Sequence, residues 1–364
     1  MKEYLPWLYR WFRGEVLSVP GKVIAITFFT CLIVIPLIST DSYMLRVLTL
    51  AAIFSIYTVS WDLLAGFTGQ INLGHALFFG VAAYVAALVN IHFGLPPWVT
   101  ISVGAVTAVA IGLIVGTPAL RLRGLYLSLV TLSFPIILTG LIFAFPNYTG
   151  GELGLFGLDP LSNSKIVDYY IVVLVLLGST LVMWKFTDAG SKFVRTGVIL
   201  RAIREDEIAA RVSGVHTTKF KLLAFAVSGF FAGIAGGLCA HFLRVAGPSN
   251  LELMFSFQAI IWTIFGGIST IYGGITGVYI LYLVIEFIRL SGEIAEEIRF
   301  VFLALILIFT LLFMPEGLTT WVRDRIEIIC PRCKKINLMT RHSCRVCRAP
   351  LHLERNHTDE KKGA

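Results

Sequence analysis

The chain has 364 residues, of which 57% are hydrophobic and 14% are charged, and its mean hydropathy is +0.82. This composition excludes a soluble globular protein of this length and indicates an integral membrane protein. The 30 lysines and arginines exceed the 22 acidic residues by 8, but the basic residues gather in loops between apolar segments. Membrane topology therefore accounts for the positive charge, and nucleic acid is not an expected partner.

The first 21 residues are predicted to form a cytoplasmic, interfacial segment. Aromatic rings favour the depth of the lipid headgroups, and lysine and arginine favour the cytoplasmic side of the membrane. No small-residue cleavage site follows the first apolar run, so no cleavable signal peptide is expected. The residues behind this prediction are Lys2, Arg10 and Arg13 together with Tyr4, Trp7, Tyr9, Trp11 and Phe12.

Ten apolar segments follow between residues 22 and 318, each close to the ~20 residues that cross a bilayer. They cover residues 22–38, 44–65, 72–92, 98–118, 124–146, 168–186, 222–243, 253–270, 272–289 and 298–314. With the N-terminus inside, ten crossings place Arg121, Arg123, the basic loop 187–219 and the C-terminus in the cytoplasm. The sequence therefore predicts an all-α polytopic membrane protein with about ten transmembrane helices, or as few as eight if the glycine-rich ranges 66–92 and 253–289 contain broken helices.

A glycine-rich stretch at residues 61–84, which overlaps the first of these two ranges, is the candidate translocation path or gate. Glycines permit close backbone approach or an unwound turn, and polar side chains at membrane depth need partners. Helix packing through small residues explains the glycines equally well, whereas the polar side chains favour a path or gate. The candidate residues are Gly66, Gly69, Gly74, Gln70, Asn72 and His75.

The loop 187–219 is predicted to contain a short amphipathic helix over residues 197–214. Opposite charges one turn apart support a helix, and glycine is a natural C-terminal stop. Such a helix rests on anionic lipid or docks into a groove of a partner protein, and its small residues favour docking. Its apolar face is predicted from Val198, Ala202, Ile203, Ala209 and Val212, its charge pairs from Arg201 with Glu205 and Glu207 with Arg211, and its end from Gly214.

A separate C-terminal unit is predicted at residues 328–353, followed by a disordered polar tail at residues 354–364. Two Cys-x-x-Cys pairs ten residues apart, Cys330 with Cys333 and Cys344 with Cys347, are typical of a zinc ribbon. A cytoplasmic location keeps thiols reduced, and four sulfur ligands leave no open position for catalysis. We therefore expect structural zinc in a ribbon that contacts protein or only stabilises itself.

Several motifs resemble, in the right order along residues 40–320, the LivM-type permease of branched-chain amino acid ABC importers. The longest is Leu-Leu-Ala-Gly-Phe-Thr-Gly-Gln-Ile-Asn-Leu-Gly-His-Ala at residues 63–76. Within the loop helix, Ala209-Ala210 followed by Gly214 is similar to the segment that importer permeases present to their ATPases, with Ile208 displacing the family's leading glutamate. The other matches are Leu122 to Tyr126 with Thr131-Leu132, Gly150-Gly151 with Gly154-Leu155, Gly266-Gly267 with Gly273-Gly274 and Gly277, and Met314 to Leu318.

The resemblance implies a permease domain at residues 22–318 in the plasma membrane of a prokaryote. It implies three kinds of protein partner: ABC ATPase subunits, a second LivH-type permease subunit and an extracytoplasmic substrate-binding protein. It assigns the loop helix to ATPase coupling, through Arg201, Arg204, Glu207, Ala209, Ala210 and Gly214. The zinc ribbon departs from the usual family pattern, so the resemblance implies nothing about it.

The expected function is that of a permease subunit in an ATP-driven ABC importer for branched-chain or related amino acids. No Gly-x-x-x-x-Gly-Lys-Ser/Thr phosphate loop occurs, so the chain is not expected to be an enzyme and ATP would act only through partner subunits. The alternative is a self-sufficient channel or secondary carrier for a small polar solute. The scarcity of carboxylates and histidines arranged as a relay weakens a proton-coupled carrier. A membrane-anchored zinc-ribbon regulator ranks last.

Overall fold

The computed structural model describes residues 20–38, 41–122, 124–188, 195–290, 296–333, 336–339, 341–344 and 346–351. The predicted interfacial segment up to residue 19, Arg123 and the predicted tail at residues 354–364 lie outside these ranges. The chain divides into two compact units, Ile35–Leu318 and Met1–Val34 with Thr319–Ala364, which are described separately.

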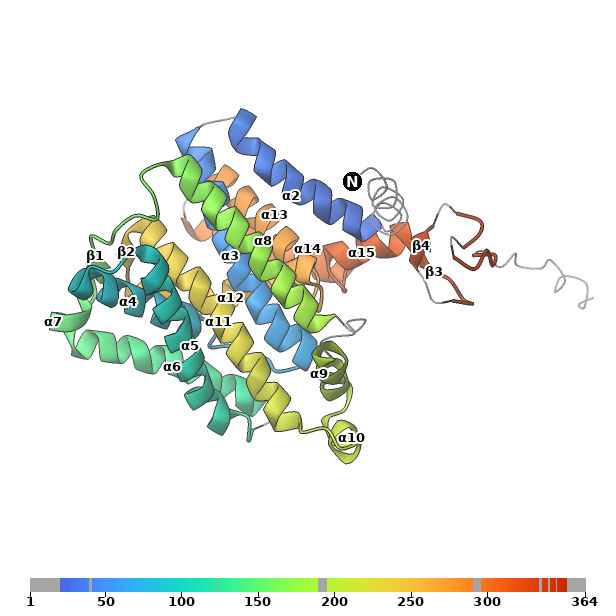
Figure 1. Cartoon of the computed structure of the whole chain (residues 1–364), viewed down its shortest axis with the longest axis horizontal. Coiled ribbons are helices and arrows are strands. Elements are labelled where there is room, and N and C mark those ends of the chain that lie inside the picture. The colour runs from blue at the N-terminus through green and yellow to red at the C-terminus, as the bar shows by residue number, and fades with distance from the viewer. Residues whose placement is uncertain are drawn as a thin grey trace, which may run out of the picture. The chain divides into compact units, whose positions relative to one another are not determined.

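Helices make up nearly all of the described chain (Figure 1). Those of ten residues or more are α2 (Pro20–Ile38), α3 (Ser42–Thr68), α4 (Ala76–Phe93), α5 (Pro97–Ala119), α6 (Leu125–Ala144), α8 (Lys165–Thr187), α9 (Thr196–Glu205), α11 (Thr217–Leu243), α12 (Leu253–Gly266), α13 (Ile271–Leu290) and α14 (Glu296–Phe313). The shorter ones are α7 (Pro146–Thr149), α10 (Glu207–Val212), α15 (Leu318–Ile326) and the 3₁₀ turn η2 (Pro248–Leu251).

Eight helical ranges of the described chain are long and apolar enough to cross a membrane. Seven are α3, α4, α5, α6, α8, α11 and α13, and the eighth is Ala304–Ile326. Apolar stretches of α2 and α12 are shorter, at Ile26–Leu37 and Leu253–Gly266. The predicted all-α polytopic fold is therefore confirmed, at the lower end of the expected eight to ten spans.

Helices α3 and α11 form the centre of the larger unit. Helix α3 packs against α8, α11, α12 and α13, and α11 packs against α4 and α5 as well. Small residues bring these backbones close together, as membrane helices require in the absence of a water-driven force. A Cβ atom at Gly236 of α11 would lie 2.1 Å from the Phe79 carbonyl oxygen of α4, and one at Gly233 would lie 2.8 Å from Ala105 Cα of α5.

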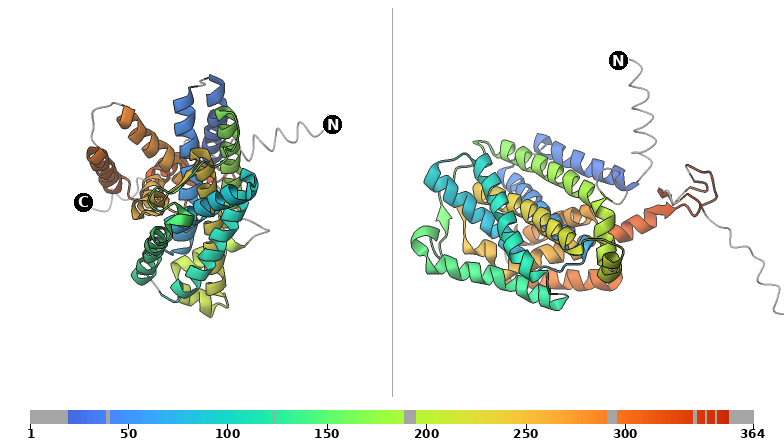
Figure 2. Two further views of the ribbon diagram at one scale, coloured as in Figure 1. Left: turned by 90° about the vertical axis from the view of Figure 1, so that its left-hand side faces the viewer. Right: turned by 60° about the horizontal axis from the view of Figure 1, so that its bottom comes forward.

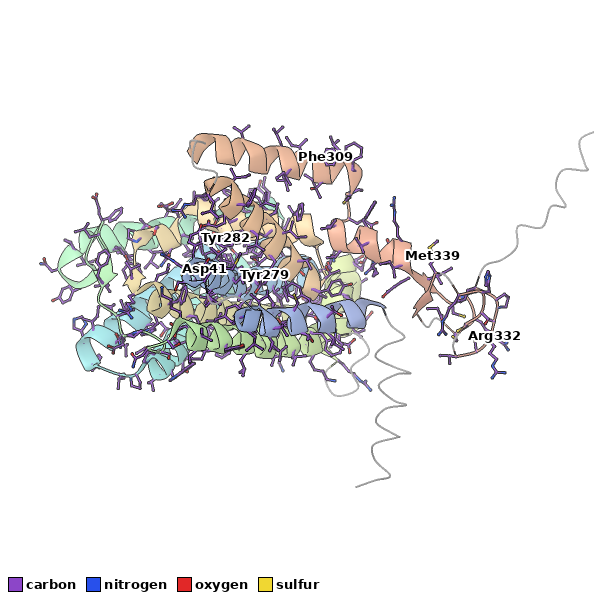
Figure 3. All side chains as sticks on the ribbon, turned by 90° about the horizontal axis from the view of Figure 1, so that it is seen from above. Asp41, Tyr279, Tyr282, Phe309, Arg332 and Met339 are labelled. Atoms are coloured by element: carbon purple, nitrogen blue, oxygen red, sulfur yellow. The ribbon has the colours of Figure 1, made fainter. Side chains whose placement is uncertain are left out.

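Other helices expose apolar side chains where lipid would surround the bundle. On α6, Leu129, Ile136 and Ile137 are exposed. Phe309 on α14 is exposed as well, whereas Tyr279 on α13 is buried (Figure 3). Exposed apolar surface of this extent suits a hydrocarbon environment and not water.

Both glycine-rich ranges contain breaks in the helical backbone. Helix α3 ends at Gly69, whose φ of 72° favours glycine, and an irregular segment runs to His75 before α4 begins. Helix α12 stops after 14 residues, and Gly267 follows with a φ of 122°. The predicted spans 72–92 and 253–270 are therefore each shorter than expected, because the backbone leaves the helix at these glycines.

Two small antiparallel sheets complete the fold. Strands β1 (Leu155–Phe156) and β2 (Val245–Ala246) pair, so that the loop before α8 joins the end of α11. Strands β3 (Glu327–Ile329) and β4 (Ile336–Leu338) pair within the C-terminal unit. In the larger unit, β1 and β2 lie at the end opposite α9 and α10 (Figure 1 and Figure 2).

Candidate functional site

The segment between α3 and α4 carries the polar residues of the candidate path or gate. Gln70, Asn72 and His75 are all buried. The Gly74 amide donates to Asn72 Oδ1 at 2.9 Å, and Trp61 Nε1 donates to the Asn72 carbonyl oxygen at 2.8 Å. Both polar atoms of the Gln70 side chain lack a hydrogen-bond partner among the described residues. His75 Nδ1 likewise lacks a partner among these residues, so Gln70 and His75 both have unused hydrogen-bonding capacity, a feature that burial makes costly.

His75 joins three helices at the centre of the bundle. Its Nε2 lies 2.9 Å from Ser60 Oγ on α3, and Ser228 Oγ on α11 donates to the Ser60 carbonyl oxygen at 2.7 Å. Since Ser60 Oγ also donates to the Tyr57 carbonyl oxygen at 2.6 Å, its remaining capacity is to accept, which favours the His75 tautomer protonated on Nε2. This chain of contacts ties the start of α4 to both central helices.

The predicted glycines permit close approach at three points. A Cβ atom at Gly74 would lie 1.8 Å from the Thr131 carbonyl oxygen of α6. A Cβ atom at Gly66 would lie 2.0 Å from Asp62 Oδ1 and 2.8 Å from the Ser269 nitrogen. Gly69 ends α3 beside Arg204 of α9. Glycine is therefore required sterically at Gly66 and Gly74 and conformationally at Gly69.

The loop 187–219 forms two helices, α9 and α10, instead of the single predicted helix. Asp206 separates them with an extended backbone at φ −152° and ψ 106°. Its carboxylate accepts from the amides of Ile208 at 2.8 Å and Ala209 at 3.0 Å, which caps α10. Helix α10 ends at Val212, and Gly214 follows with a φ of 86°, so the predicted stop is confirmed.

The face of this helix pair that packs against the bundle was not predicted, since the predicted apolar face was expected to meet lipid or a partner. Gly197, Leu200 and Ile203, at intervals of three residues, face the bundle. Of the predicted apolar face, Ile203 alone is buried; Val198, Ala202, Ala209 and Val212 are exposed. The prediction of one continuous helix is wrong at Asp206, where an extended backbone separates α9 from α10. The sequence signal for the inner face was Leu200, three residues before Ile203.

Arg204 attaches α9 to α3, one of the two central helices. Its Nη1 donates to the Gly66 carbonyl oxygen at 2.6 Å and also contacts Ser269 Oγ, in the turn between α12 and α13. The Ser269 amide in turn donates to Asp62 Oδ1 at 2.8 Å, and Ser269 Oγ donates to the Gly66 carbonyl oxygen at 2.8 Å. The end of α3, the turn after α12 and α9 are therefore held by one guanidinium. Charged hydrogen bonds of this kind contribute about 1.5–3 kcal/mol each.

Glu207 attaches α10 to α11. Its Oε2 lies 2.7 Å from Lys221 Nζ, and its Oε1 lies 3.0 Å from Arg211 Nη2 and 3.4 Å from Thr217 Oγ1. Lys221 is buried, so this ion pair is shielded from water more than a surface pair. Sequence reasoning singled out Glu207 and missed its partner Lys221, whose position four residues into α11 gave no sign of the contact.

The remaining residues of the predicted coupling set differ in their surroundings. The guanidinium of Arg201 lies over the Phe67 ring at 5.8 Å from its centroid. Ala209 is exposed and Ala210 is buried. Val198, Ile208 and Val212 are 51%, 60% and 83% exposed, and we call these three side chains the apolar ridge. An apolar ridge on a helix pair with charged anchors is typical of a surface that a partner covers.

The four predicted cysteine ligands come together in the C-terminal unit. Their sulfur atoms all lie within 4.8 Å of one another, with 3.5 Å between Cys330 and Cys347 and 3.5 Å between Cys333 and Cys344. A tetrahedral site with 2.3 Å zinc–sulfur bonds separates its sulfurs by about 3.8 Å. Backbone amides of Cys347 and Val346 donate to the Cys344 sulfur and lower the pKa of Cys344 to about 6. The four cysteines can therefore hold a metal ion as thiolates.

Taken together, the apolar helices and the polar break beside α4 define a multi-pass membrane protein. The chain belongs to the family described as the permease component of the branched-chain amino acid transport system, which it matches over residues 43–311. The resemblance expected from the sequence motifs is thus confirmed.

Relatives agree with this family. The chain is 28% identical over 308 residues to the high-affinity branched-chain amino acid transport system permease protein LivM of Escherichia coli, covering 77% of this chain and 71% of the relative. It is 28% identical over 272 residues to a probable LivH of Methanocaldococcus jannaschii, covering 68% and 82%. It is 22% identical over 218 residues to the guanosine ABC transporter permease protein NupQ of Bacillus subtilis, covering 55% and 67%. No solved structure matches the chain.

Proposed function

We propose that this chain is a membrane-spanning subunit of an ATP-driven ABC importer for branched-chain or related amino acids. ATPase subunits would dock on α9 and α10, and closure of the ATPase pair would move these helices and switch the bundle from outward to inward access. The observation that carries the proposal is the apolar ridge, because it lies on a helix pair that Arg204 and Glu207 fix to the bundle. A surface attached in this way can pass a displacement to α3 and α11.

The remaining parts of the proposal follow the family and the charge distribution. The bundle would lie in a prokaryotic plasma membrane with the basic loop 187–219 and both termini in the cytoplasm. A LivH-type permease would complete the pathway, and a binding protein would deliver the solute at the opposite face. The coupling role would extend over Arg201, Arg204, Glu207, Ala209, Ala210 and Gly214. The path or gate would use Gln70, Asn72 and His75 beside Gly66, Gly69 and Gly74.

In the C-terminal unit, Cys330, Cys333, Cys344 and Cys347 would bind structural zinc as a ribbon over residues 328–353. The support is the close grouping of four sulfur atoms. Four thiolates complete a tetrahedral shell, so the ion would stabilise the fold and perform no catalysis.

The test is co-purification of an ATPase with the tagged, membrane-extracted chain. In Val212→Asp, a carboxylate would enter the apolar contact, and we expect at least a ten-fold loss of captured ATPase. The control His216→Asp adds the same charge outside the ridge, at the N-cap of α11 where aspartate is favoured, and should retain the ATPase. If neither the native chain nor the control captures an ATPase while vesicles holding the chain alone move solute, the carrier alternative replaces the importer.

A further inference from the structure

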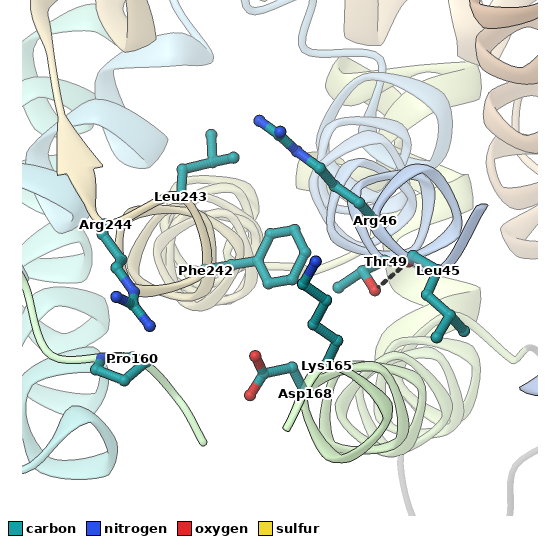
Figure 4. Close-up of a pocket in the computed structure, with 9 residues that line it drawn as sticks. All are labelled: Leu45, Arg46, Thr49, Pro160, Lys165, Asp168, Phe242, Leu243 and Arg244. Carbon is teal, nitrogen blue, oxygen red and sulfur yellow. Dashed lines mark hydrogen bonds between the residues drawn. The ribbon is translucent and has the colours of Figure 1, made fainter. Parts of the chain in front are cut away.

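A charged cavity lies at the end of the bundle opposite α9 and α10. It has a volume of about 320 Å³ and opens between the first turns of α3 and α8 and the last turn of α11 (Figure 4). Arg46, Lys165 and Arg244 bring three positive charges to its wall, and Asp168 brings one negative charge. A cavity at a helical bundle's mouth with charges of both signs is suited to a small polar solute.

Asp168 is the first sign that the cavity accommodates a ligand. This aspartate is only 9% exposed, and its Oδ1 atom has no hydrogen-bond partner among the described residues. The Ser162 backbone amide satisfies part of the carboxylate. No ion pair within the described part of the chain joins Asp168 to the neighbouring cations. A buried carboxylate oxygen without a partner is unfavourable, so this position favours a donor supplied from outside the chain.

Arg244 is the second sign. It ends α11 in the left-handed conformation with a φ of 59°, and its amide donates to the Ala240 carbonyl oxygen. Glycine is the usual residue at such a position, because a Cβ atom makes the conformation less favourable. A long cationic side chain kept here at the cavity wall indicates that the guanidinium itself is used. This argument is independent of the one from Asp168.

We propose that this cavity binds the charged head of a zwitterionic α-amino acid, an inference that rests on the proposed function and adds a subsite to it. The α-ammonium group would donate to Asp168 Oδ1. The α-carboxylate would accept from Arg244 and its cationic neighbours, since guanidinium groups match carboxylates in geometry and charge. An apolar side chain would pack against Leu45, Phe242 and Leu243, which also line the cavity.

The location of the cavity indicates the stage of transport at which a solute would occupy it. The far end of α3, at Gly66, meets Arg204 of α9, whereas Arg46 lies near the start of α3. The cavity is therefore separated from the helix pair by the length of α3. A solute held there would be at the face where a binding protein releases it, before it reaches the polar segment around Gln70.

Binding of L-leucine to the full-length chain in nanodiscs of phosphatidylglycerol tests the assignment. The analogue 4-methylpentanoate lacks the ammonium group, and L-leucinamide lacks the carboxylate. We expect saturable binding of L-leucine, with each analogue roughly ten-fold weaker, as expected for loss of one charged hydrogen bond. Absence of saturable L-leucine binding, or equal affinity for all three compounds, overturns the proposal.

Two variants assign the two charges separately. Asp168→Asn should weaken L-leucine roughly ten-fold, whereas 4-methylpentanoate, which has no ammonium group to lose a partner, should bind at least as tightly as before. Arg244→Gly relieves the left-handed strain, so its unfolding temperature should be no lower than that of the native chain, while L-leucine binding weakens roughly ten-fold and L-leucinamide stays unchanged. The control Arg289→Gln removes a cation near Tyr43, outside the cavity wall. An equal loss in this control would show that general surface charge, and not the cavity, attracts the solute.

A zwitterionic phospholipid headgroup offers similar charges, so the lipid is varied as well. Retention of phosphatidylethanolamine by the delipidated native chain but not by Arg244→Gly, together with failure of L-leucine to displace it, assigns the cavity to lipid and overturns the proposal.

The importer itself is judged by ATPase capture. If the native chain captures an ATPase that drives uptake, and both cavity variants take up L-leucine with unchanged half-saturation, the subsite alone is wrong; if no ATPase is captured, the proposed function is wrong.

Discussion

At the scale of single residues, the bundle depends on positions where no side chain fits. Gly66 lies between the Asp62 side chain of its own helix α3 and the turn that holds Ser269, and Gly74 lies against the backbone of α6. Other glycines face open space; a Cβ atom at Gly140 of α6 would have no neighbour within 4 Å. The same residue type therefore has two different roles, and atomic surroundings separate them.

Gly66→Ala is expected to destabilise the bundle, because its Cβ atom would lie 2.0 Å from Asp62 Oδ1 and 2.8 Å from the Ser269 nitrogen. Overpacking of this kind costs about 1–3 kcal/mol. The matched control Gly140→Ala, also within a helix, should be neutral or stabilising by up to ~1 kcal/mol through helix propensity. Thermal unfolding of the detergent-solubilised chain measures both. Equal unfolding temperatures for the two variants would contradict the steric argument.

At the scale of elements, the sequence predicted where the apolar segments lie but not where the backbone leaves them. Length and hydropathy placed nearly every long helix, because a bilayer imposes a minimum apolar length. The breaks at Gly69 and Gly267 depend on positive φ values, which glycine permits but does not require. The glycine-rich composition therefore indicated that a break was possible, and tertiary packing decided its position.

The candidate site was also predicted only in part from the sequence. The cysteine spacing specified which four sulfur atoms meet, since two Cys-x-x-Cys pairs have few ways to close a tetrahedron. The inner face of α9 was not predictable in the same way. Asp206 was treated as a residue of one helix, although it caps a second one. The anchors Ser269 and Lys221 are also missing from the prediction, because their contacts join segments far apart in the sequence.

The anchoring of α9 leads to a prediction about coupling. Arg204→Gln removes the charge that contacts Gly66 and Ser269, and we expect at least a ten-fold decrease in solute transported per ATP hydrolysed, with ATPase capture unchanged. The control Arg195→Gln removes an exposed cation next to α9 that is outside the proposed coupling set, and it should reduce this ratio less than two-fold. Uptake and ATP hydrolysis in proteoliposomes give the ratio. A parallel decrease in both variants would assign the effect to surface charge.

At the scale of the whole molecule, the two compact units depend on different forces. The unit Ile35–Leu318 is held by close helix packing over a large apolar core. The ribbon part of the other unit has a small buried cluster consisting of Cys330, Cys344 and Leu351 with partly buried neighbours. So small a core contributes little to the free energy of folding, and a metal ion bound to four cysteines would contribute most of the ribbon's stability.

Metal removal should therefore unfold the ribbon and leave the bundle intact. A strong zinc chelator is expected to make residues 328–351 sensitive to protease while the unfolding temperature of the membrane unit stays the same, because that unit contains no cluster of metal ligands among its described residues. Cys344→Ser should reproduce the effect without chelator and lower bound zinc from about one ion per chain to nearly none. The control Cys31→Ser changes an exposed cysteine outside the cluster and should keep the ion. Zinc content by atomic absorption, with protease mapping by mass spectrometry, provides both readouts. If the ribbon stays protected from protease in the chelated protein, its apolar contacts are sufficient to keep it folded. A metal ion bound by the four cysteines would then not be needed for its structure.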